Sequence, residues 1–380
     1  MKLALVVPGG VDRSGEFRVI PALLALLERL ARTHEVHVFA LQQEAAPGDW
    51  ELAGASIHNI GAGRTRLRAI AAIRAEHRRA PFDVIHAIFS GSCSLVAVVA
   101  AKLLRLPSLV HVAGGELVAL HAIDYGGRRK WQGRLREACV LRGADVVTAA
   151  SAPIIDALHA LGIDAQRVAL GVDLGRWPPL APRARHAPPR LIHVASLNRV
   201  KDQPTLLHAL ANLREAGVAF RMDIVGVDTL QGEMQQLARR LGLEACVSFP
   251  GFRTQRELRP LMEAADLLVM SSLHEAGPLV LLEAAVAGVP AVGTAVGHFV
   301  EWSPSAARAA PVGDWAALAD AIGQVLADEP LRLQLAAAAQ RRAGLEDADA
   351  TARLFEALYR HACAGRRGSG GFARHVKAEP

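Results

Sequence analysis

The sequence predicts an α/β protein built from two doubly wound domains of similar size. Three observations support this: the 380-residue length exceeds one typical domain, strand-like apolar runs alternate with helix-like segments, and a Pro-rich stretch interrupts that alternation near the middle. The Pro-rich stretch, residues 177–189, is predicted to link a first domain (1–176) to a second (190–348). A last helix (349–363) should pack back on the first domain. The Gly- and Arg-rich tail (364–380) is expected to be disordered.

The first half alternates strand and helix patterns from its first residues. Short runs of Val, Ile and Leu predict buried strands, and apolar residues at helical spacing, as at 20, 23, 24, 27 and 30, predict helices. The expected strands are 2–7, 35–41, 56–60, 83–88, 108–112 and 145–150, and the expected helices are 19–32, 64–79, 93–105 and 152–161.

A second β-α series begins at residue 190. Its expected strands are 191–195, 221–225, 247–250, 266–270 and 291–293. Helices are expected to begin near Gln203, Leu230, Gln255 and Pro278, followed by helices over 315–327 and 330–343. In open parallel sheets of this kind, ligands bind at the carboxyl ends of the strands, so residues that follow a strand are the candidates for a site.

Composition excludes several classes of protein. The four cysteines are scattered without C-x-x-C spacing, which argues against a zinc site or a disulfide framework and fits a reducing cytoplasm. The start of the chain lacks the pattern of a signal peptide, and the longest apolar run is far too short to span a membrane. The sequence therefore predicts a cytoplasmic protein.

Positive charge is concentrated in the first half of a chain whose formal net charge is +6. Nucleic acid is not the expected partner, because only 4% of residues are aromatic and few are available to stack on bases. Two interpretations remain open: a face that meets anionic lipid at the inner side of the plasma membrane or a phosphorylated acceptor, and an ordinary solvated helical surface. The two groups are Arg64, Arg66, Arg68, Arg74, Arg78 and Arg79, and Arg128, Arg129, Lys130, Arg134 and Arg136.

The most informative stretch is residues 274–284, His-Glu-Ala-Gly-Pro-Leu-Val-Leu-Leu-Glu-Ala. A predicted strand precedes it and a predicted helix follows, so Glu275 should lie in the loop and Glu283 two turns into the helix. The amides at this helix N-terminus suit an anion or sugar hydroxyls, and Pro278 pre-sets the first turn. The plainer interpretation is that Glu275 caps the helix and that Glu283 is a surface or salt-bridged residue.

This segment resembles the E-x7-E element of retaining GT-B glycosyltransferases of family 4. The resemblance implies that Glu275 and the backbone of Ala276, Gly277, Pro278 and Leu279 hold the donor sugar, and that Glu283 accepts hydrogen bonds from the nucleotide ribose. It implies a GT-B fold, in which two Rossmann-like domains face each other across a cleft. It also implies metal-independent chemistry without a cofactor.

A second element of the same family precedes it. The segment 194–203, Val-Ala-Ser-Leu-Asn-Arg-Val-Lys-Asp-Gln, resembles the family's G-R-L-x3-K-G element, whose Arg and Lys hold the diphosphate. Lys201 matches that Lys, but Ser196 stands at the place of the Arg. Arg199 is the candidate to supply the missing charge.

Loops that follow other predicted strands complete the expected site. The resemblance implies that Gly9 and Gly10 lie under the donor phosphate, and that Gly226, Phe252 and Arg253 flank the nucleotide. Gly114, Gly115 and Glu116 are expected on the acceptor side. The family often has a His near this last loop, but here Ala113 stands in its place.

The resemblance implies a hexosyltransferase that uses a nucleotide-diphosphate sugar and a glycan, lipid-linked or small-molecule acceptor, in cell-envelope or exopolysaccharide synthesis. Two alternatives stay open. One is a GT-B sugar-nucleotide 2-epimerase. The other, motivated by Ser196 and Ala113, is a non-catalytic nucleotide-sugar-binding protein.

Overall fold

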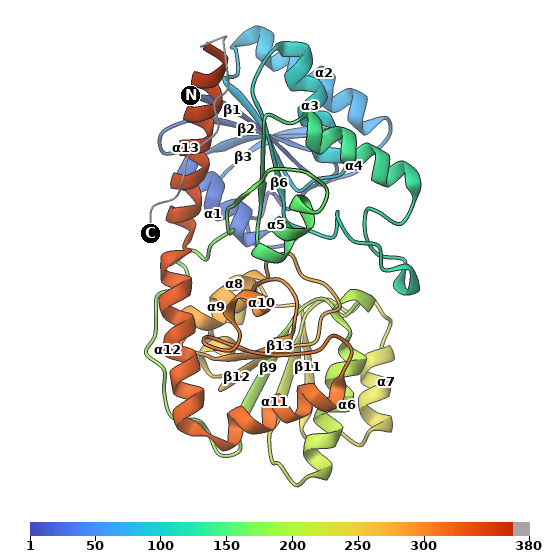
Figure 1. Ribbon diagram of the computed structural model, residues 1–380, viewed down its shortest axis with the longest axis vertical. Helices are drawn as coiled ribbons and strands as arrows, with labels where there is room; N and C mark the ends of the chain where they lie inside the picture. The colour runs from blue at the N-terminus through green and yellow to red at the C-terminus, as the bar shows by residue number, and fades with distance from the viewer. Residues whose placement is uncertain (368–380) are drawn as a thin grey trace.

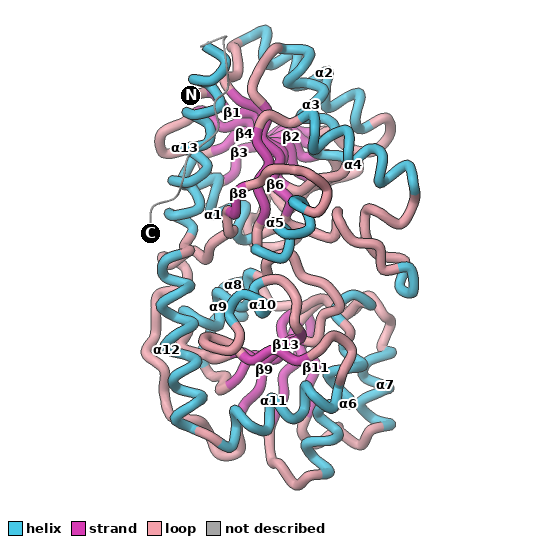
Figure 2. The backbone as a smooth tube through the Cα atoms, viewed as in Figure 1, coloured by secondary structure: helices cyan, strands magenta, loops and turns pink. Residues whose placement is uncertain are grey.

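A computed structural model describes residues 1–367, which form two α/β domains placed end to end (Figures 1 and 2). The N-terminal domain contains an eight-stranded sheet in the order β3-β4-β2-β1-β5-β6-β7-β8. All pairings are parallel except that of the edge strand β3. The strands are β1 (Lys2–Val7), β2 (Glu35–Ala40), β3 (Gly48–Leu52), β4 (Ala55–Asn59), β5 (Val84–Ile88), β6 (Ser108–Val112), β7 (Val146–Ala149) and β8 (Gln166–Arg167).

Helices cover both faces of this sheet, as expected when parallel strands are joined by helical crossovers. On one face α1 packs under β1 and β2, and on the other α3 contacts β5 and β6 and lies between α2 and α4. The helices are α1 (Pro21–Leu30), α2 (Thr65–Arg79), α3 (Ser92–Leu104), α4 (Trp131–Gly143) and α5 (Ala152–His159), with a 3₁₀ turn η1 (His121–Ile123).

The C-terminal domain has a six-stranded parallel sheet in the order β11-β10-β9-β12-β13-β14. The chain order reverses direction across β9 and β12, which makes their carboxyl ends the switch point where ligands bind in such sheets. The strands are β9 (Arg190–Val194), β10 (Arg221–Val225), β11 (Val247–Gly251), β12 (Leu267–Met270), β13 (Ala291–Thr294) and β14 (Arg308–Ala310). The helices are η2 (Arg199–Lys201), α6 (Gln203–Glu215), α7 (Glu233–Arg240), α8 (Gln255–Glu263), α9 (Leu279–Val286), α10 (His298–Trp302), α11 (Trp315–Ala327) and α12 (Glu329–Leu345).

The chain crosses between the domains twice. The Pro-rich segment 177–189 begins with Trp177, which is only 3% exposed and so belongs to the interdomain region rather than to a loose tether. At the end of the chain α13 (Ala348–Arg367) continues from α12 up the side of the N-terminal domain (Figure 1). There it packs on α1 and buries Phe355 and Tyr359, whose hydroxyl lies 2.8 Å from His86 Nδ1.

The structure corrects the expected start of the disordered tail. Residues 364–367, predicted to be disordered, form the last turn of α13. The helix continues past Cys363 because the residues up to Arg367 include no Pro and only one Gly to interrupt it. The rest of the predicted tail, residues 368–380, lies outside the described residues.

Candidate functional site

Lys201, expected to hold the diphosphate, and Glu275, expected to hold the donor sugar, meet at the carboxyl edge of the C-terminal sheet. Lys201 closes the turn η2 after β9, and Glu275 lies in the loop after β12. Because β9 and β12 are adjacent parallel strands, the loops that follow them converge. Lys201 Nζ lies 2.5 Å from Glu275 Oε1, although the two residues are 74 positions apart. The pair is partly accessible, with the lysine side chain 23% exposed and the glutamate side chain 10% exposed.

Hydrogen bonds fix both members of this pair. Ser272 Oγ donates to Glu275 Oε1 at 2.7 Å, and Ser271 Oγ donates to the carbonyl of Lys201 at 2.8 Å. The Asn198 side chain accepts from the Lys201 amide and so caps the turn η2. The site therefore holds a positive and a negative side chain in set positions, the first suited to a phosphate and the second to sugar hydroxyls.

The structure places Glu283 in a separate network from the Lys201–Glu275 pair. Glu283 is on α9 and only 3% exposed, and its Oε1 accepts from Gln255 Nε2 at 3.0 Å. Gln255 in turn accepts from the Trp177 indole N–H at 2.6 Å. Burial raises the pKa of Glu283 to about 7, against which the Gln255 hydrogen bond acts only weakly. The plainer alternative of a surface or salt-bridged Glu283 does not hold, because the side chain is buried and bound to an amide.

The backbone at residues 276–279 lies between the two domains. Ala276 packs into the core of the N-terminal domain, and Gly277 lies between Ala150 of that domain and His298. A Cβ at Gly277 would lie 3.0 Å from His298 Nε2 and 3.1 Å from the Cβ of Ala150, so a side chain there would crowd the contact between the domains. Pro278 precedes Leu279 at the start of α9, whose first turn carries no side-chain cap and so leaves its amides to other partners.

The two residues expected around the missing Arg do not join the Lys201–Glu275 pair. Ser196 is exposed. Arg199 is on the outer side of η2, with its guanidinium 3.5 Å from Glu233 of α7 and 61% exposed. In this structure, therefore, Lys201 stands next to Glu275 without a contribution from Arg199.

Gly226 and Phe252 line a cavity of about 260 Å³ at the ends of β10 and β11. A Cβ at Gly226 would lie 2.0 Å from the carbonyl oxygen of Ala195, so the close approach of the two loops requires glycine. The Phe252 ring is 5.9 Å from that of Phe17, which reaches across from the N-terminal domain. Arg253 donates to the carbonyl of Phe252 and does not line the cavity.

The loop after β1 is occupied by a side chain of its own domain. The amides of Gly10 and Val11 both donate to Gln43 Oε1, at 2.7 and 3.0 Å. Gly10 has a positive φ of 82°, and Gly9 lies against the same glutamine. The Gly10 amide, expected under the donor phosphate, is thus bound to Gln43 in this structure.

The loop expected on the acceptor side contacts the donor side directly. The carbonyl of Gly114 lies 3.2 Å from His274 Nε2. Glu116 accepts from the amides of Gly114 and Ser90, at 2.7 and 2.8 Å, which ties two loops of the N-terminal domain together. Burial raises the pKa of Glu116 despite these hydrogen bonds. Gly115 packs against Tyr125. Glu116 is therefore an anchor of this loop.

Sequence reasoning missed an interdomain clasp built around Glu301 of α10. Its carboxylate accepts from the amide of Ala152, at the start of α5, at 2.8 Å, and pairs with Arg167 at 2.8 Å. Arg167 also pairs with Glu346 through both guanidinium nitrogens. Burial acts to raise the pKa of Glu301, but the His298 side chain, the Ala152 amide and Arg167 together hold it at about 2. The signal was weak, because α10 has only five residues and its partners are far away in the sequence.

Glu301→Gln is expected to lower kcat/KM about tenfold, mainly through a higher donor KM, because it removes one charge from a pair that joins the domains. The pKa of Glu301 is about 2 in the folded protein, below its ordinary value of 4.5. The contribution of this carboxylate to folding stability is therefore fully present above pH 4.5 and is lost as the pH falls through 2. Steady-state kinetics at pH 7 measure the effect. The matched control is Glu346→Gln, which removes the other partner of Arg167 but leaves the Ala152 contact. Equal effects of the two changes would contradict the clasp.

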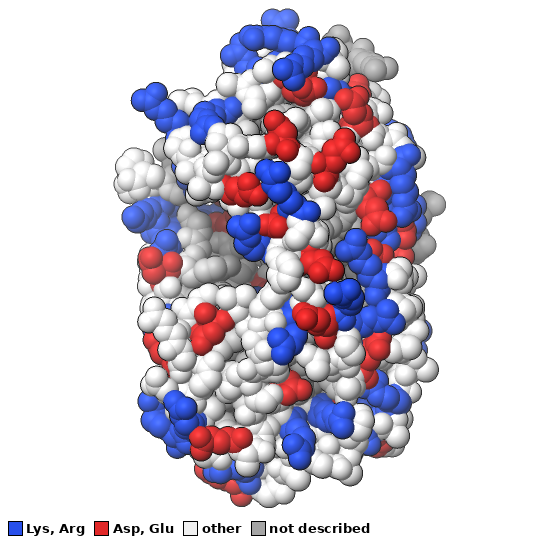
Figure 3. All heavy atoms as spheres, turned by 180° about the vertical axis from the view of Figure 1, so that it is seen from behind, with Lys and Arg blue, Asp and Glu red and all other residues white. Residues whose placement is uncertain are grey.

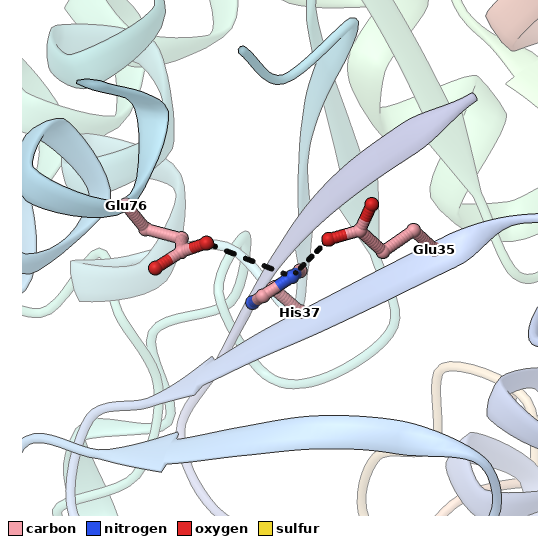
Figure 4. Close-up of side chains that lie close together, drawn as sticks. All are labelled: Glu35, His37 and Glu76. Carbon is pink, nitrogen blue, oxygen red and sulfur yellow. Dashed lines mark hydrogen bonds and ion pairs between the residues drawn. The ribbon is translucent and has the colours of Figure 1, made fainter. Parts of the chain in front are cut away.

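Of the residues that the structure describes, one group has the ligand spacing of a metal site: Glu35, His37 and Glu76 (Figure 4). Lys2 Nζ already lies 2.8 Å from Glu76 and 3.0 Å from Glu35, so a cation of the protein balances these carboxylates. Lys2 and Glu35 open β1 and β2, at the opposite edge of the sheet from the site. The group is a structural ion network.

The described part of the chain includes no helix both long and apolar enough to cross a membrane.

Comparison with known proteins follows the same division into domains. Residues 19–171 match the family model described as "Glycosyl transferase 4-like domain", and residues 181–342 match "Glycosyl transferases group 1". The relatives include the "Putative colanic acid biosynthesis glycosyltransferase WcaL" of Escherichia coli, which is 29% identical over 54% of this chain and 53% of its own length. Glycogen synthase of Mycobacterium tuberculosis is 32% identical over 59% of this chain and 56% of its own length. The matched part thus spans about half the length of these two relatives.

Solved structures agree on the fold. Sucrose-phosphate synthase of Thermosynechococcus elongatus superposes with a TM-score of 0.81 at 20% identity, covering 96% of this chain and all of that one. Anabaena Alr3699/HepE in complex with UDP-glucose has a TM-score of 0.73 at 20% identity, covering 95% of this chain and all of that one. Two family models that together cover most of the chain, and a two-domain fold shared with these structures, show that the chain belongs to the GT-B glycosyltransferases of family 4.

Proposed function

We propose that this glycosyltransferase moves a hexose from a nucleotide-diphosphate sugar to an acceptor with retention of anomeric configuration. The acceptor would be a glycan, a lipid-linked sugar or a small molecule in cell-envelope or exopolysaccharide synthesis. The observation that carries the proposal is the Lys201–Glu275 pair at the switch point of the C-terminal sheet. WcaL, named for colanic acid biosynthesis, supports the polysaccharide setting.

Lys201 would supply the positive charge that the reaction needs. The departing nucleotide diphosphate gains negative charge in the transition state, and a fixed ammonium group stabilises that charge without a metal ion. The donor would replace the Lys201–Glu275 contact, since the lysine is accessible and its present partner is a carboxylate. Ser271 and Asn198 hold the lysine backbone in place during this exchange.

Glu275 would orient the transferred sugar. Released from Lys201, its Oε1 keeps the Ser272 hydrogen bond, and its remaining acceptor positions suit sugar hydroxyls. The amides at the start of α9 would face the same sugar or the phosphate next to it. The leaving phosphate oxygen would take the proton of the acceptor hydroxyl on the same face, so no side chain is assigned as general base.

Glu283 would bind the ribose, and this role gives donor binding a pH dependence. The carboxylate accepts two hydroxyl donors when ionised, but with a pKa of about 7 it is half protonated at neutral pH. We expect donor affinity to rise several-fold between pH 6 and pH 8, with the midpoint moved below 7 once donor stabilises the charged form. Calorimetric titrations across this range measure it. The control Glu283→Gln should bind weakly and without this pH dependence, and an unchanged pH profile in the variant would contradict the role.

The raised pKa of Glu283 also determines how the folding stability of the donor-free protein changes with pH. An unfolded glutamate ionises near its ordinary pKa of 4.5, whereas the folded Glu283 keeps its proton up to about 7. The donor-free protein should therefore lose stability as the pH rises from 4.5 to 7, as far as this one residue is concerned.

Product analysis tests the proposed reaction. Purified protein is incubated with UDP-, GDP-, ADP- and dTDP-hexoses, with and without a membrane glycolipid extract, and the products are separated by mass and by anomeric configuration. Transfer with retained configuration, or slow donor hydrolysis without acceptor, is the expected result. A donor epimer formed without acceptor would indicate the 2-epimerase instead. Donor binding without any product would favour the non-catalytic alternative that the exposed Ser196 motivates.

A further inference from the structure

The outer surface of the N-terminal domain carries exposed apolar side chains on three neighbouring helices. Leu67 on α2, Leu103 on α3, and Trp131 and Leu135 on α4 are each 57–69% exposed. Trp131 and Leu135 are four residues apart on α4 and so lie on the same side of that helix. Because α3 packs against both α2 and α4, the three helices form one continuous layer, here called the α2–α4 layer (Figure 1). Large apolar side chains are spread over that layer, and no part of the chain within residues 1–367 covers them.

The charge of the α2–α4 layer has a single sign. The only carboxylates within its three helices are Glu76, which is bound to Lys2, and Glu137, which is buried. Of its exposed cations only Arg79 pairs with a carboxylate among the described residues, at 3.4 Å from Glu76. Figure 3 shows Lys and Arg gathered at the top of the molecule, the end at which α2 lies. The exposed cations on these helices and their ends are Arg64, Arg66, Arg68, Arg74, Arg78, Arg79, Lys102, Arg105, Lys130, Arg134 and Arg142.

An ordinary solvated surface does not explain this combination. Solvated helices usually mix both signs of charge and keep Trp and Leu away from water. Here exposed cations, of which only Arg79 pairs with a carboxylate among the described residues, surround exposed Trp and Leu. This is the composition of surfaces that lie on anionic lipid, where the cations meet headgroups and the apolar side chains enter the interface. Nucleic acid fits less well, since three of the four exposed apolar residues are leucines, which do not stack on bases.

A cavity lies between the start of α2 in the α2–α4 layer and the loops that follow strands of the N-terminal sheet. It has a volume of about 620 Å³ and is lined by Arg64, Arg66 and Leu67 at the start of α2, and by Ser90, Ser92 and Cys93 around the start of α3. Leu67 thus belongs both to the exposed layer and to the cavity wall. A molecule that enters from the layer meets first a leucine and two arginines and then the polar residues after β5.

We propose that the α2–α4 layer docks on an anionic membrane surface, so that the cavity receives the anionic head of a lipid-linked acceptor. The docking step stands on the exposed residues alone. The acceptor step rests on the proposed glycosyl transfer and narrows its acceptor to the lipid-linked class.

Vesicle sedimentation tests the docking step with the full-length protein. Vesicles of phosphatidylcholine that contain about 30 mol% of the anionic lipid phosphatidylglycerol should bind the protein at low salt. Vesicles of pure phosphatidylcholine should not. Trp131→Ser/Leu135→Ser and Arg74→Glu/Arg78→Glu should each lower binding about tenfold. None of these residues touches the candidate site, so donor affinity should stay unchanged. Matched controls from the other domain, Trp315→Ser/Leu345→Ser and Arg239→Glu/Arg240→Glu, should bind vesicles like the parent protein.

Absence of binding to the anionic vesicles would overturn the proposal, as would equal losses in the control variants or a preference for duplex DNA over vesicles. The acceptor step is tested by adding polyprenyl phosphate to phosphatidylcholine vesicles. Recruitment that Arg64→Ala/Arg66→Ala abolishes is the expected result, and recruitment unchanged by this variant would refute it. Donor binding is measured separately, so a protein that binds vesicles but no nucleotide sugar would refute the proposed function and leave the docking step intact.

Discussion

Replacing Lys201 with alanine is expected to lower kcat for donor turnover about 100-fold to 1,000-fold, the usual effect of removing one fixed donor that stabilises transition-state charge. Arg199, the candidate to replace this charge, pairs with Glu233 on the outer side of η2. The change leaves Glu275 without its ion-pair partner, although the Ser272 hydrogen bond remains. Steady-state kinetics and the melting temperature of the variant separate a loss of catalysis from a loss of folding.

Arg199→Ala is the matched control for this prediction. It removes a positive charge from the same 3₁₀ turn at a position that is 61% exposed, and less than threefold change in kcat is expected. If Arg199→Ala were as damaging as Lys201→Ala, Arg199 would have to swing inward in the donor complex and replace the missing family Arg. Full activity of Lys201→Ala would remove the lysine from the mechanism.

Replacing Glu275 with glutamine is expected to lower kcat about 100-fold while donor affinity changes much less. The variant keeps the size of the side chain and can still accept from Ser272, but it loses the charge that strengthens hydrogen bonds to the sugar in the transition state. Kinetics at saturating donor, together with calorimetric donor affinity, divide the effect between turnover and binding.

Glu263→Gln is the corresponding control, a carboxylate of the same domain that pairs with Arg259 on α8 and lies outside the Lys201–Glu275 pair. It should keep parental kinetics. A Glu275→Gln variant that loses donor affinity while kcat stays unchanged would show uniform binding of the ground state and transition state, which contradicts a role in orienting the sugar for reaction.

The fold could be predicted where burial imposes a simple pattern. Strand 2–7 is apolar after its first residue because both faces of a parallel sheet are covered, and its bounds match the structure. The missed elements lack that pattern. β3, Gly-Asp-Trp-Glu-Leu, is a partly exposed antiparallel edge strand, and α10 is only five residues long. α4 has almost no one-sided apolar pattern, since it buries Gly133 and Glu137 while exposing Trp131 and Leu135.

Within the site, only the residues that belong to a sequence motif could be predicted. Lys201 and Glu275 follow neighbouring strands, so their loops had to meet, and the resemblance supplied their roles. The partners of Glu283 could not be read from the sequence, because Gln255 and Trp177 reach it from a different helix and from the interdomain segment. The Glu301–Ala152 contact depends on how the two domains are docked. Gln43, which binds the Gly10 amide, comes from the loop after the adjacent strand and belongs to no motif.

The central claim is that this edge of the C-terminal domain binds a nucleotide-diphosphate sugar. The most direct test is a calorimetric binding panel of UDP-, GDP-, ADP- and dTDP-sugars, with NADH as a negative control, on the parent protein and on Glu283→Ala. Selective binding of one nucleotide, lost in the variant while the melting transition stays cooperative, is the predicted result. Binding of none of them, or binding that Glu283→Ala leaves unchanged, would contradict the account.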